Sequence, residues 1–249
     1  MLVVFDFDGV LADPVFSIAT IAHKAYCRLY RKTPLEFVVK AIRDAKHVLR
    51  AGPDIMPVVL LAVEGKNLKR LTREELLEFE KTLGKNLRKL EQAYYRAKFP
   101  LRKDEQYWAS LFKPHKTALT QFKEVMKKYK VFIATTRHRE DILLCFGDWG
   151  VRFDENNIVD LRISKDKVEQ FRYIRKKTKV PFKRMIFIED TLWNARAVKK
   201  LGVHVLLSTW GLSNKQQHKQ AEMLGIKPIK RQSDVLREIE RLAKTLLKR

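Results

Sequence analysis

Residues 3–9 read VVFDFDG, and this stretch decides the fold because an apolar segment ends there in two acidic residues and a glycine. The short apolar run from Met1 to Phe5 predicts a buried strand. Side chains alternate along a strand, so Asp6 and Asp8 can emerge on the same side of the chain. Two carboxylates this close are unfavourable unless a cation or a shared proton relieves them. The pair therefore suggests a metal-assisted reaction with one carboxylate as nucleophile and the other as acid and base.

Two more apolar stretches end in polar residues later in the chain. Residues 131–134 are followed by Thr135 and Thr136, and residues 185–188 are followed by Glu189 and Asp190. Strand and helix patterns alternate from about residue 117 onward, which predicts an α/β fold with a parallel sheet and helices on both faces. Ligands of such sheets bind outside the carboxyl ends of the strands. The three polar strand ends therefore define a candidate site.

The segment from residue 14 to residue 115 has a helical pattern and few strand signals. Thr72 and Glu75 form a capping-box sequence that opens a long amphipathic run, and Pro100 is expected to close it. The chain is therefore predicted to have two domains. Residues 1–13 and 116–249 form the α/β core, and residues 14–115 form an inserted helical domain.

Four motifs in this order resemble those of the haloacid dehalogenase superfamily. They are the strand and Asp-x-Asp-Gly of residues 3–11, the strand ending at Thr135, a lysine before a helix, and the strand ending in Glu189 and Asp190. Lys165 is the preferred candidate for the lysine, and Lys167 is the second. The resemblance implies a Rossmann-like core, a helical cap inserted after the first motif, and Mg²⁺-dependent phosphatase or phosphotransferase activity.

The resemblance also implies roles for single residues. Asp6 would attack the phosphoryl group, and Asp8 would protonate the leaving oxygen. Thr135 and Lys165 would be catalytic and hold phosphoryl oxygens, and Thr136 would contact substrate. A carboxylate pocket facing phosphate suits a hard cation with oxygen ligands.

The implied Mg²⁺ ligands are Asp6, Asp8 through its backbone carbonyl, Glu189 and Asp190. The sequence departs from the family pattern at two of the relevant positions. Glu189 stands where many members have glycine, although the Glu189-Asp190 pair is similar to the sugar-phosphomutase branch. Asn194 replaces the second acid that often follows four residues after the first. Asp8 argues against a dehalogenase, because that subgroup has a non-acidic residue there.

The composition sets limits on partners and location. The chain has 249 residues and a formal net charge of +23. Residues 14–115 contain 21 basic and 11 acidic residues, and residues 116–249 contain 31 basic and 15 acidic residues. This diffuse positive charge favours anionic substrates and would allow weak nucleic-acid binding. The two cysteines, Cys27 and Cys145, fit a reducing cytoplasm, and no apolar run is long enough to span a membrane.

The predicted function is hydrolysis of small phosphate monoesters through an aspartyl-phosphate, with Mg²⁺ as cofactor. One alternative is a sugar phosphomutase, which would return the phosphoryl group to a sugar instead of to water. Another is a basic nucleic-acid-associated phosphatase or binding protein, suggested by the net charge alone. Because caps of this superfamily select substrates, the sequence leaves the substrate open.

Overall fold

The computed structural model describes residues 1–50 and 52–247. The chain divides into two compact units, one made of residues 1–13 and 114–249 and the other of residues 14–113. The boundary after the insertion therefore lies two residues before the predicted one. The two segments at this boundary, β2 (Ala12–Asp13) and β3 (Lys113–Pro114), pair as a two-stranded sheet.

The core unit is built on a six-stranded sheet with strand order β5-β4-β1-β6-β7-β8. Its neighbouring strands are parallel to one another throughout the described residues, which confirms the predicted α/β class. The strand that carries the Asp-x-Asp sequence, β1, is central: Phe5 is in register with Ile133 of one neighbour and with Ile188 of the other. The strands are β1 (Leu2–Phe5), β4 (Lys130–Ala134), β5 (Ile158–Val159), β6 (Met185–Glu189), β7 (His204–Ser208) and β8 (Lys227–Ile229).

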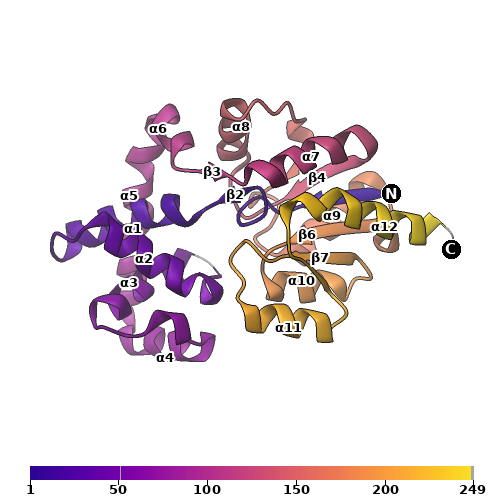
Figure 1. The fold of residues 1–249 in the computed structure, drawn as a ribbon. Helices are drawn as coiled ribbons and strands as arrows, with labels where there is room; N and C mark the ends of the chain where they lie inside the picture. The colour runs from indigo at the N-terminus through magenta and orange to yellow at the C-terminus, as the bar shows by residue number, and fades with distance from the viewer. Residues whose placement is uncertain (51, 248–249) are drawn as a thin grey trace. The chain divides into compact units, whose positions relative to one another are not determined.

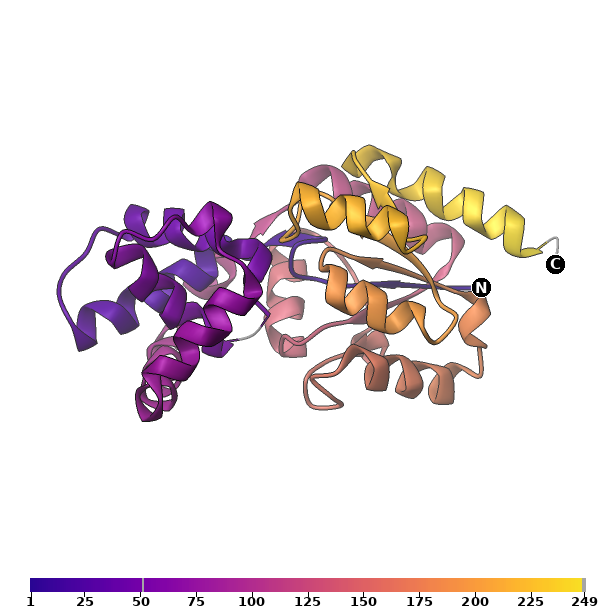
Figure 2. The ribbon, with the colours of Figure 1, turned by 90° about the horizontal axis from the view of Figure 1, so that it is seen from below.

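Helices cover both faces of this sheet (Figures 1 and 2). On one face, alternate strand residues such as Leu2 and Val4 belong to a buried cluster with Phe171 and Ala195. On the other face the Phe5 ring meets the Phe122 ring edge-on at 5.0 Å. The helices are α7 (Lys116–Lys128), α8 (Arg139–Asp148), α9 (Lys167–Thr178), α10 (Leu192–Lys199), α11 (Lys215–Met223) and α12 (Val235–Leu247).

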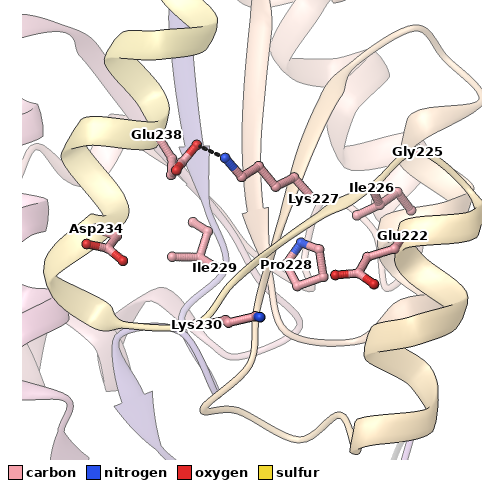
Figure 3. A pocket seen from close by; sticks show the side chains of 9 residues that line it. All are labelled: Glu222, Gly225, Ile226, Lys227, Pro228, Ile229, Lys230, Asp234 and Glu238. Atoms are coloured by element: carbon pink, nitrogen blue, oxygen red, sulfur yellow. Dashed lines mark hydrogen bonds and ion pairs between the residues drawn. The ribbon is translucent and has the colours of Figure 1, made fainter.

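The sheet ends at β8, whose middle residue is Pro228. Proline has no N–H to donate, so it interrupts the row of backbone groups that an edge strand offers to another strand. An open cavity of about 550 Å³ lies beside this edge. Figure 3 shows that acidic and basic side chains both line it, and that Lys227 donates a hydrogen bond to Glu238 at 2.5 Å.

The described residues of the second unit form six α-helices: α1 (Val15–Leu29), α2 (Leu35–Ala45), α3 (Ile55–Val63), α4 (Arg73–Leu83), α5 (Lys85–Lys103) and α6 (Glu105–Ser110). The capping box at Thr72 and Glu75 is present. The expectation that Pro100 ends its helix is wrong, because α5 continues to Lys103. Leu101 is buried, and its packing offsets the backbone hydrogen bond that proline cannot donate. Among the described residues, no helix has the length and apolar character needed to cross a membrane.

Candidate active site

The site begins where β1 ends and the chain turns. The backbone N–H of Asp6 still donates to Ile188 of the neighbouring strand at 2.9 Å, and the N–H of Phe7 donates to the Asp6 carboxylate at 2.7 Å. The side chain of Asp6 is buried at this strand end, whereas that of Asp8 is about a quarter exposed, at 23%. Gly9 follows with a φ of +74°, a left-handed conformation that glycine adopts without strain. The turn thus places both carboxylates at the carboxyl edge of the sheet.

Of the two candidate lysines, the structure brings Lys167 to Asp6. Its ammonium nitrogen lies 2.9 Å from Asp6 Oδ1 and 4.0 Å from Glu189 Oε2, and it donates to the Ala134 carbonyl. Lys167 is only 3% exposed. Lys165, the preferred candidate in the sequence, is exposed and precedes the cap of α9 by one residue.

Three carboxylates gather at this point. One oxygen each of Asp6, Glu189 and Asp190 lies within 4.8 Å of the others, and all three side chains are buried. Glu189 Oε1 accepts hydrogen bonds from the N–H groups of Asp190 and Thr191 and from the Thr191 hydroxyl. Asp190 Oδ2 accepts one from the N–H of Leu212 at 2.7 Å.

The other oxygens of two of these acids are buried without a hydrogen-bond partner in the described part of the chain. These are Glu189 Oε2 and Asp190 Oδ1. Three buried carboxylates share one nearby ammonium group, that of Lys167, so the cluster has an excess of negative charge. Burial, opposed by Lys167 and reinforced by Glu189, raises the pKa of Asp6 to about 7. Burial, Glu189 and Asp6 also raise the pKa of Asp190 well above its usual value. A hard divalent cation with oxygen ligands would satisfy the two oxygens and offset this charge, so the donor set fits such an ion.

Two glycines make room for Asp190. A Cβ atom built on Gly9 would lie 1.7 Å from Asp190 Oδ2, and one built on Gly211 would lie 2.4 Å from Asp190 Cβ. Both distances are shorter than any non-bonded contact allows. The backbone of the first turn and that of the loop after β7 therefore enclose this carboxylate on two sides.

Arg137 is a site residue that the sequence argument missed. Its Nε lies 3.0 Å from Asp8 Oδ2 and its Nη2 lies 2.9 Å from Asp8 Oδ1, so the guanidinium binds the carboxylate through two parallel hydrogen bonds. Such forked pairs are among the stronger and more directional ones in proteins. Its position in the turn after a strand end, two residues beyond Thr135, is the one signal in the sequence that could have suggested it.

The remaining candidates lie in different surroundings. Thr135 is buried, and its hydroxyl accepts from the N–H of Arg137 at 3.1 Å while its carbonyl accepts from Gln170 at 2.6 Å. Thr136, the next residue, is exposed. Asn194 is half-buried on α10. The turn after β4 is thus fixed by side chains from α9 and from the turn itself.

The core unit is a parallel α/β sheet with a buried cluster of acids and one lysine at its carboxyl edge. This arrangement is typical of α/β enzymes. Comparison with known families makes this assignment definite. The family model described as haloacid dehalogenase-like hydrolase matches residues 1–202, and the chain belongs to this family of hydrolases. No curated protein matches the chain.

Solved structures with the same fold cover nearly the whole chain at low identity. A putative phosphoglycolate phosphatase from Lactobacillus delbrueckii has a TM-score of 0.67 and 14% identity, with 94% of this chain and 97% of that chain covered. A haloacid dehalogenase-like family hydrolase from Streptococcus pneumoniae has a TM-score of 0.61 and 16% identity, with 96% and 97% covered. A putative β-phosphoglucomutase from Bacteroides vulgatus has a TM-score of 0.60 and 18% identity, with 100% and 90% covered. At these identities the likeness establishes the shared fold.

Proposed function

We propose that this protein is a Mg²⁺-dependent phosphatase that hydrolyses small phosphate monoesters through an aspartyl-phosphate. The observation that carries the proposal is the buried cluster of Asp6, Glu189 and Asp190 with Lys167 2.9 Å from Asp6. An anionic nucleophile can approach an anionic phosphate only where positive charge offsets both. Two of the similar structures, a putative phosphoglycolate phosphatase and a putative β-phosphoglucomutase, support chemistry on phosphate esters.

In the first step a carboxylate oxygen of Asp6 forms a bond to phosphorus while the bond from phosphorus to the leaving oxygen breaks. Asp8, in its protonated form, donates a proton to that oxygen, so the oxygen leaves as a hydroxyl group. In the second step Asp8 takes a proton from water, the water oxygen bonds to phosphorus, and the bond to Asp6 breaks. Arg137 holds the Asp8 carboxylate in a fixed direction through its two hydrogen bonds.

The phosphoryl oxygens need positive partners during both steps. Lys167 takes the role that the family resemblance gave to Lys165, because its ammonium group is the one beside Asp6. Thr135 lies in the turn after the neighbouring strand and offers its hydroxyl. Together these groups would hold the phosphoryl oxygens and offset the charge that develops on them.

Mg²⁺ would be held by the carboxylates of Asp6, Glu189 and Asp190 and by the backbone carbonyl of Asp8. When bound, the ion supplies positive charge beside the phosphoryl group. The two buried carboxylate oxygens without hydrogen-bond partners support this assignment. The helical unit is inserted directly after Asp13, five residues past Asp8, and we assign it the selection of substrate as a cap. Two free cysteines support a cytoplasmic location.

The decisive experiment measures hydrolysis of p-nitrophenyl phosphate with Mg²⁺ and with a chelator in place of the metal. Asp6→Asn should lower turnover at least about 10³-fold, because the amide is no nucleophile. Asp148→Asn is the matched control, since Asp148 is exposed at the end of α8 and outside the cluster. Turnover by Asp6→Asn at the native rate, with both variants folded, would overturn the mechanism.

The substrate is then found with a panel of sugar phosphates, phosphoglycolate, nucleotides and oligonucleotides that carry a terminal phosphate. Release of inorganic phosphate identifies a phosphatase. Transfer of the phosphate to another hydroxyl of a hexose, without release, would identify a phosphomutase instead.

A further inference from the structure

The core unit has an open hollow of about 530 Å³ at the end of α9 that the proposed reaction does not use. Its lining residues are Arg172, Arg175, Lys176, Lys179 and Phe182. All four charged members of this set are cations and all four are exposed. We name this feature the basic hollow.

The local sequence strengthens the charge of this surface. Residues 170–188 contain seven lysines and arginines and no acidic residue. The cavity beside β8, of about 550 Å³, is lined by two lysines and three acids, so its charges largely cancel (Figure 3). Two open cavities of similar size on one unit thus differ in charge. The basic hollow is the one that concentrates positive potential, beyond what a uniformly basic surface gives.

Three cations of the basic hollow follow the spacing of one helix face. Arg175 and Lys176 lie three and four residues after Arg172, so these side chains of α9 project to the same side, and Lys179 is the residue that caps the end of the helix. From residue 172 to the end of α9 at residue 178 the helix rises about 9 Å, which spans one to two phosphate spacings of an extended nucleic-acid strand. Arg172 also pairs with Glu169 one turn earlier, and the other three cations of the set have no acidic partner within the described part of the chain.

An aromatic group completes the lining. The guanidinium of Arg175 lies over the Phe182 ring, 4.9 Å from the ring centroid. A guanidinium has a planar cationic face, the kind of surface on which nucleic-acid bases stack. A concave surface with a stacking platform suits a flexible strand better than it suits the flat surface of a membrane.

The basic hollow lies at the opposite edge of the sheet from the acid cluster. Lys167 at the start of α9 reaches Asp6 at the carboxyl edge, and the helix then runs back toward the amino edge, where β6 begins at Met185. The rise along α9 from residue 167 to residue 178 is about 17 Å. A ligand in the hollow therefore leaves the candidate active site open.

From these observations we infer that the basic hollow binds the phosphodiester backbone of single-stranded nucleic acid. The inference concerns a second site on the core unit, and it stands whether or not the acid cluster is a phosphatase. Binding there would hold the protein on a nucleic acid while the acid cluster acts on another group or molecule.

The test uses the whole protein and a single-stranded oligonucleotide of about 20 nucleotides with hydroxyl groups at both ends and an internal fluorophore. The absence of a terminal phosphate keeps the probe from imitating a phosphatase substrate. Affinity is measured by fluorescence anisotropy over a range of salt concentrations. Arg172→Gln with Lys176→Gln removes two cations of the hollow at i, i+4 spacing. Lys215→Gln with Lys219→Gln removes two exposed cations at the same spacing on α11.

The hollow variant should bind about tenfold more weakly near 0.1 M salt. The magnitude of the slope of log K against log salt concentration should fall by roughly 1.4, or about 0.7 for each lost phosphate contact. The α11 variant should differ little from the native protein. Equal weakening by both variants would overturn the inference, because it would mean attraction by the overall charge alone. The inference would also be overturned if the native protein bound vesicles with anionic lipids more tightly than the oligonucleotide and the hollow variant lost that binding. The surface would then be a membrane-binding one. Circular dichroism confirms that both variants fold.

Discussion

Each of the two units buries a small cluster of charged side chains, and the two clusters differ in how their charge is balanced. In the helical unit Arg73 lies 2.9 Å from Asp54 and 4.0 Å from Glu80. Burial and the neighbouring Asp54, to which Glu80 is hydrogen-bonded, raise the pKa of Glu80 to about 7. One arginine and one shared proton can therefore neutralise this cluster without any ligand.

The core cluster has three carboxylates beside Lys167, and two of their oxygens are buried without a hydrogen-bond partner among the described residues. One ammonium group leaves more negative charge than a single proton can remove. In the helical cluster Glu80 Oε1 is likewise buried without a hydrogen-bond partner among the described residues, so an unsatisfied oxygen alone does not distinguish the two clusters. The comparison indicates that a buried acidic cluster points to a ligand when its carboxylates converge and carry more negative charge than the neighbouring cation and one proton can neutralise. A cluster closed by an arginine and a proton points to structure alone. The following predictions test this distinction.

The largest effect is expected from removing the cation of the core cluster. Lys167→Met should lower kcat about 10²–10³-fold, because the phosphoryl group and Asp6 lose their nearest ammonium group. Lys165→Met is the matched control and should leave kcat near the native value, since Lys165 is exposed. Steady-state kinetics on p-nitrophenyl phosphate separates the two. The opposite ranking would return the phosphoryl contact to Lys165.

The second prediction concerns the fork between Arg137 and Asp8. Arg137→Lys keeps the charge but loses the two parallel hydrogen bonds, so kcat should fall about 10- to 100-fold with a smaller change in KM. Arg152→Lys, at an exposed position, should change neither. A purely structural role would show itself as a lower melting temperature with kcat unchanged.

The third prediction concerns the closed cluster of the helical unit. The folded-state pKa of Glu80 is raised above its unfolded value of about 4.5. The contribution of Glu80 to the free energy of unfolding is therefore largest below pH 4.5. It is lost as the pH rises toward 7, where the buried carboxyl ionises. Glu80→Gln should raise the melting temperature by about 2 °C at pH 8 and leave it little changed at pH 4. Glu78→Gln, on the exposed side of the same helix, is the control; the same gain from both variants would contradict the assignment.

The smallest effect compares the two cysteines, one in each unit. Burial raises the pKa of the Cys145 thiol in the core to about 12, whereas Cys27 in the helical unit is half-buried. In the native protein a maleimide should react with Cys27 and spare Cys145, and Cys27→Ser should remove nearly all labelling. Peptide mass spectrometry identifies the labelled residue. Fast labelling of Cys145 would show that its part of the core opens readily.

The fold was accessible from the sequence because its signal is repeated along the chain. Apolar strands alternate with amphipathic helices, and three strand ends carry polar groups, so the parallel sheet and its carboxyl edge follow from pattern alone. The helical character of residues 14–113 was equally clear. The end of α5 was not, because the burial of Leu101 that extends the helix past Pro100 is a tertiary contact.

The choice between the two lysines shows what the sequence lacks. Lys165 lies before the start of α9 and Lys167 lies in its first turn. Asp166 sets this start, because its carboxylate accepts hydrogen bonds from the N–H groups of Val168 and Glu169. A shift of two residues reverses which side chain meets Asp6. The pairing of Arg137 with Asp8 could not be predicted for a related reason, since the two residues are 129 positions apart and no periodicity links them.

The register of β1 has a consequence for the order in which this protein assembles. Leu2 pairs with Lys130 on one side and with Met185 on the other, so the strand that ends at Asp6 joins the sheet only when both distant strands are available. Such long-range parallel pairing is slow, because the loops must close before the contacts form. During synthesis Asp6 is therefore made well before the strands that fix its final surroundings. The reactive groups of the cluster can come together only after the chain has been translated past Asp190.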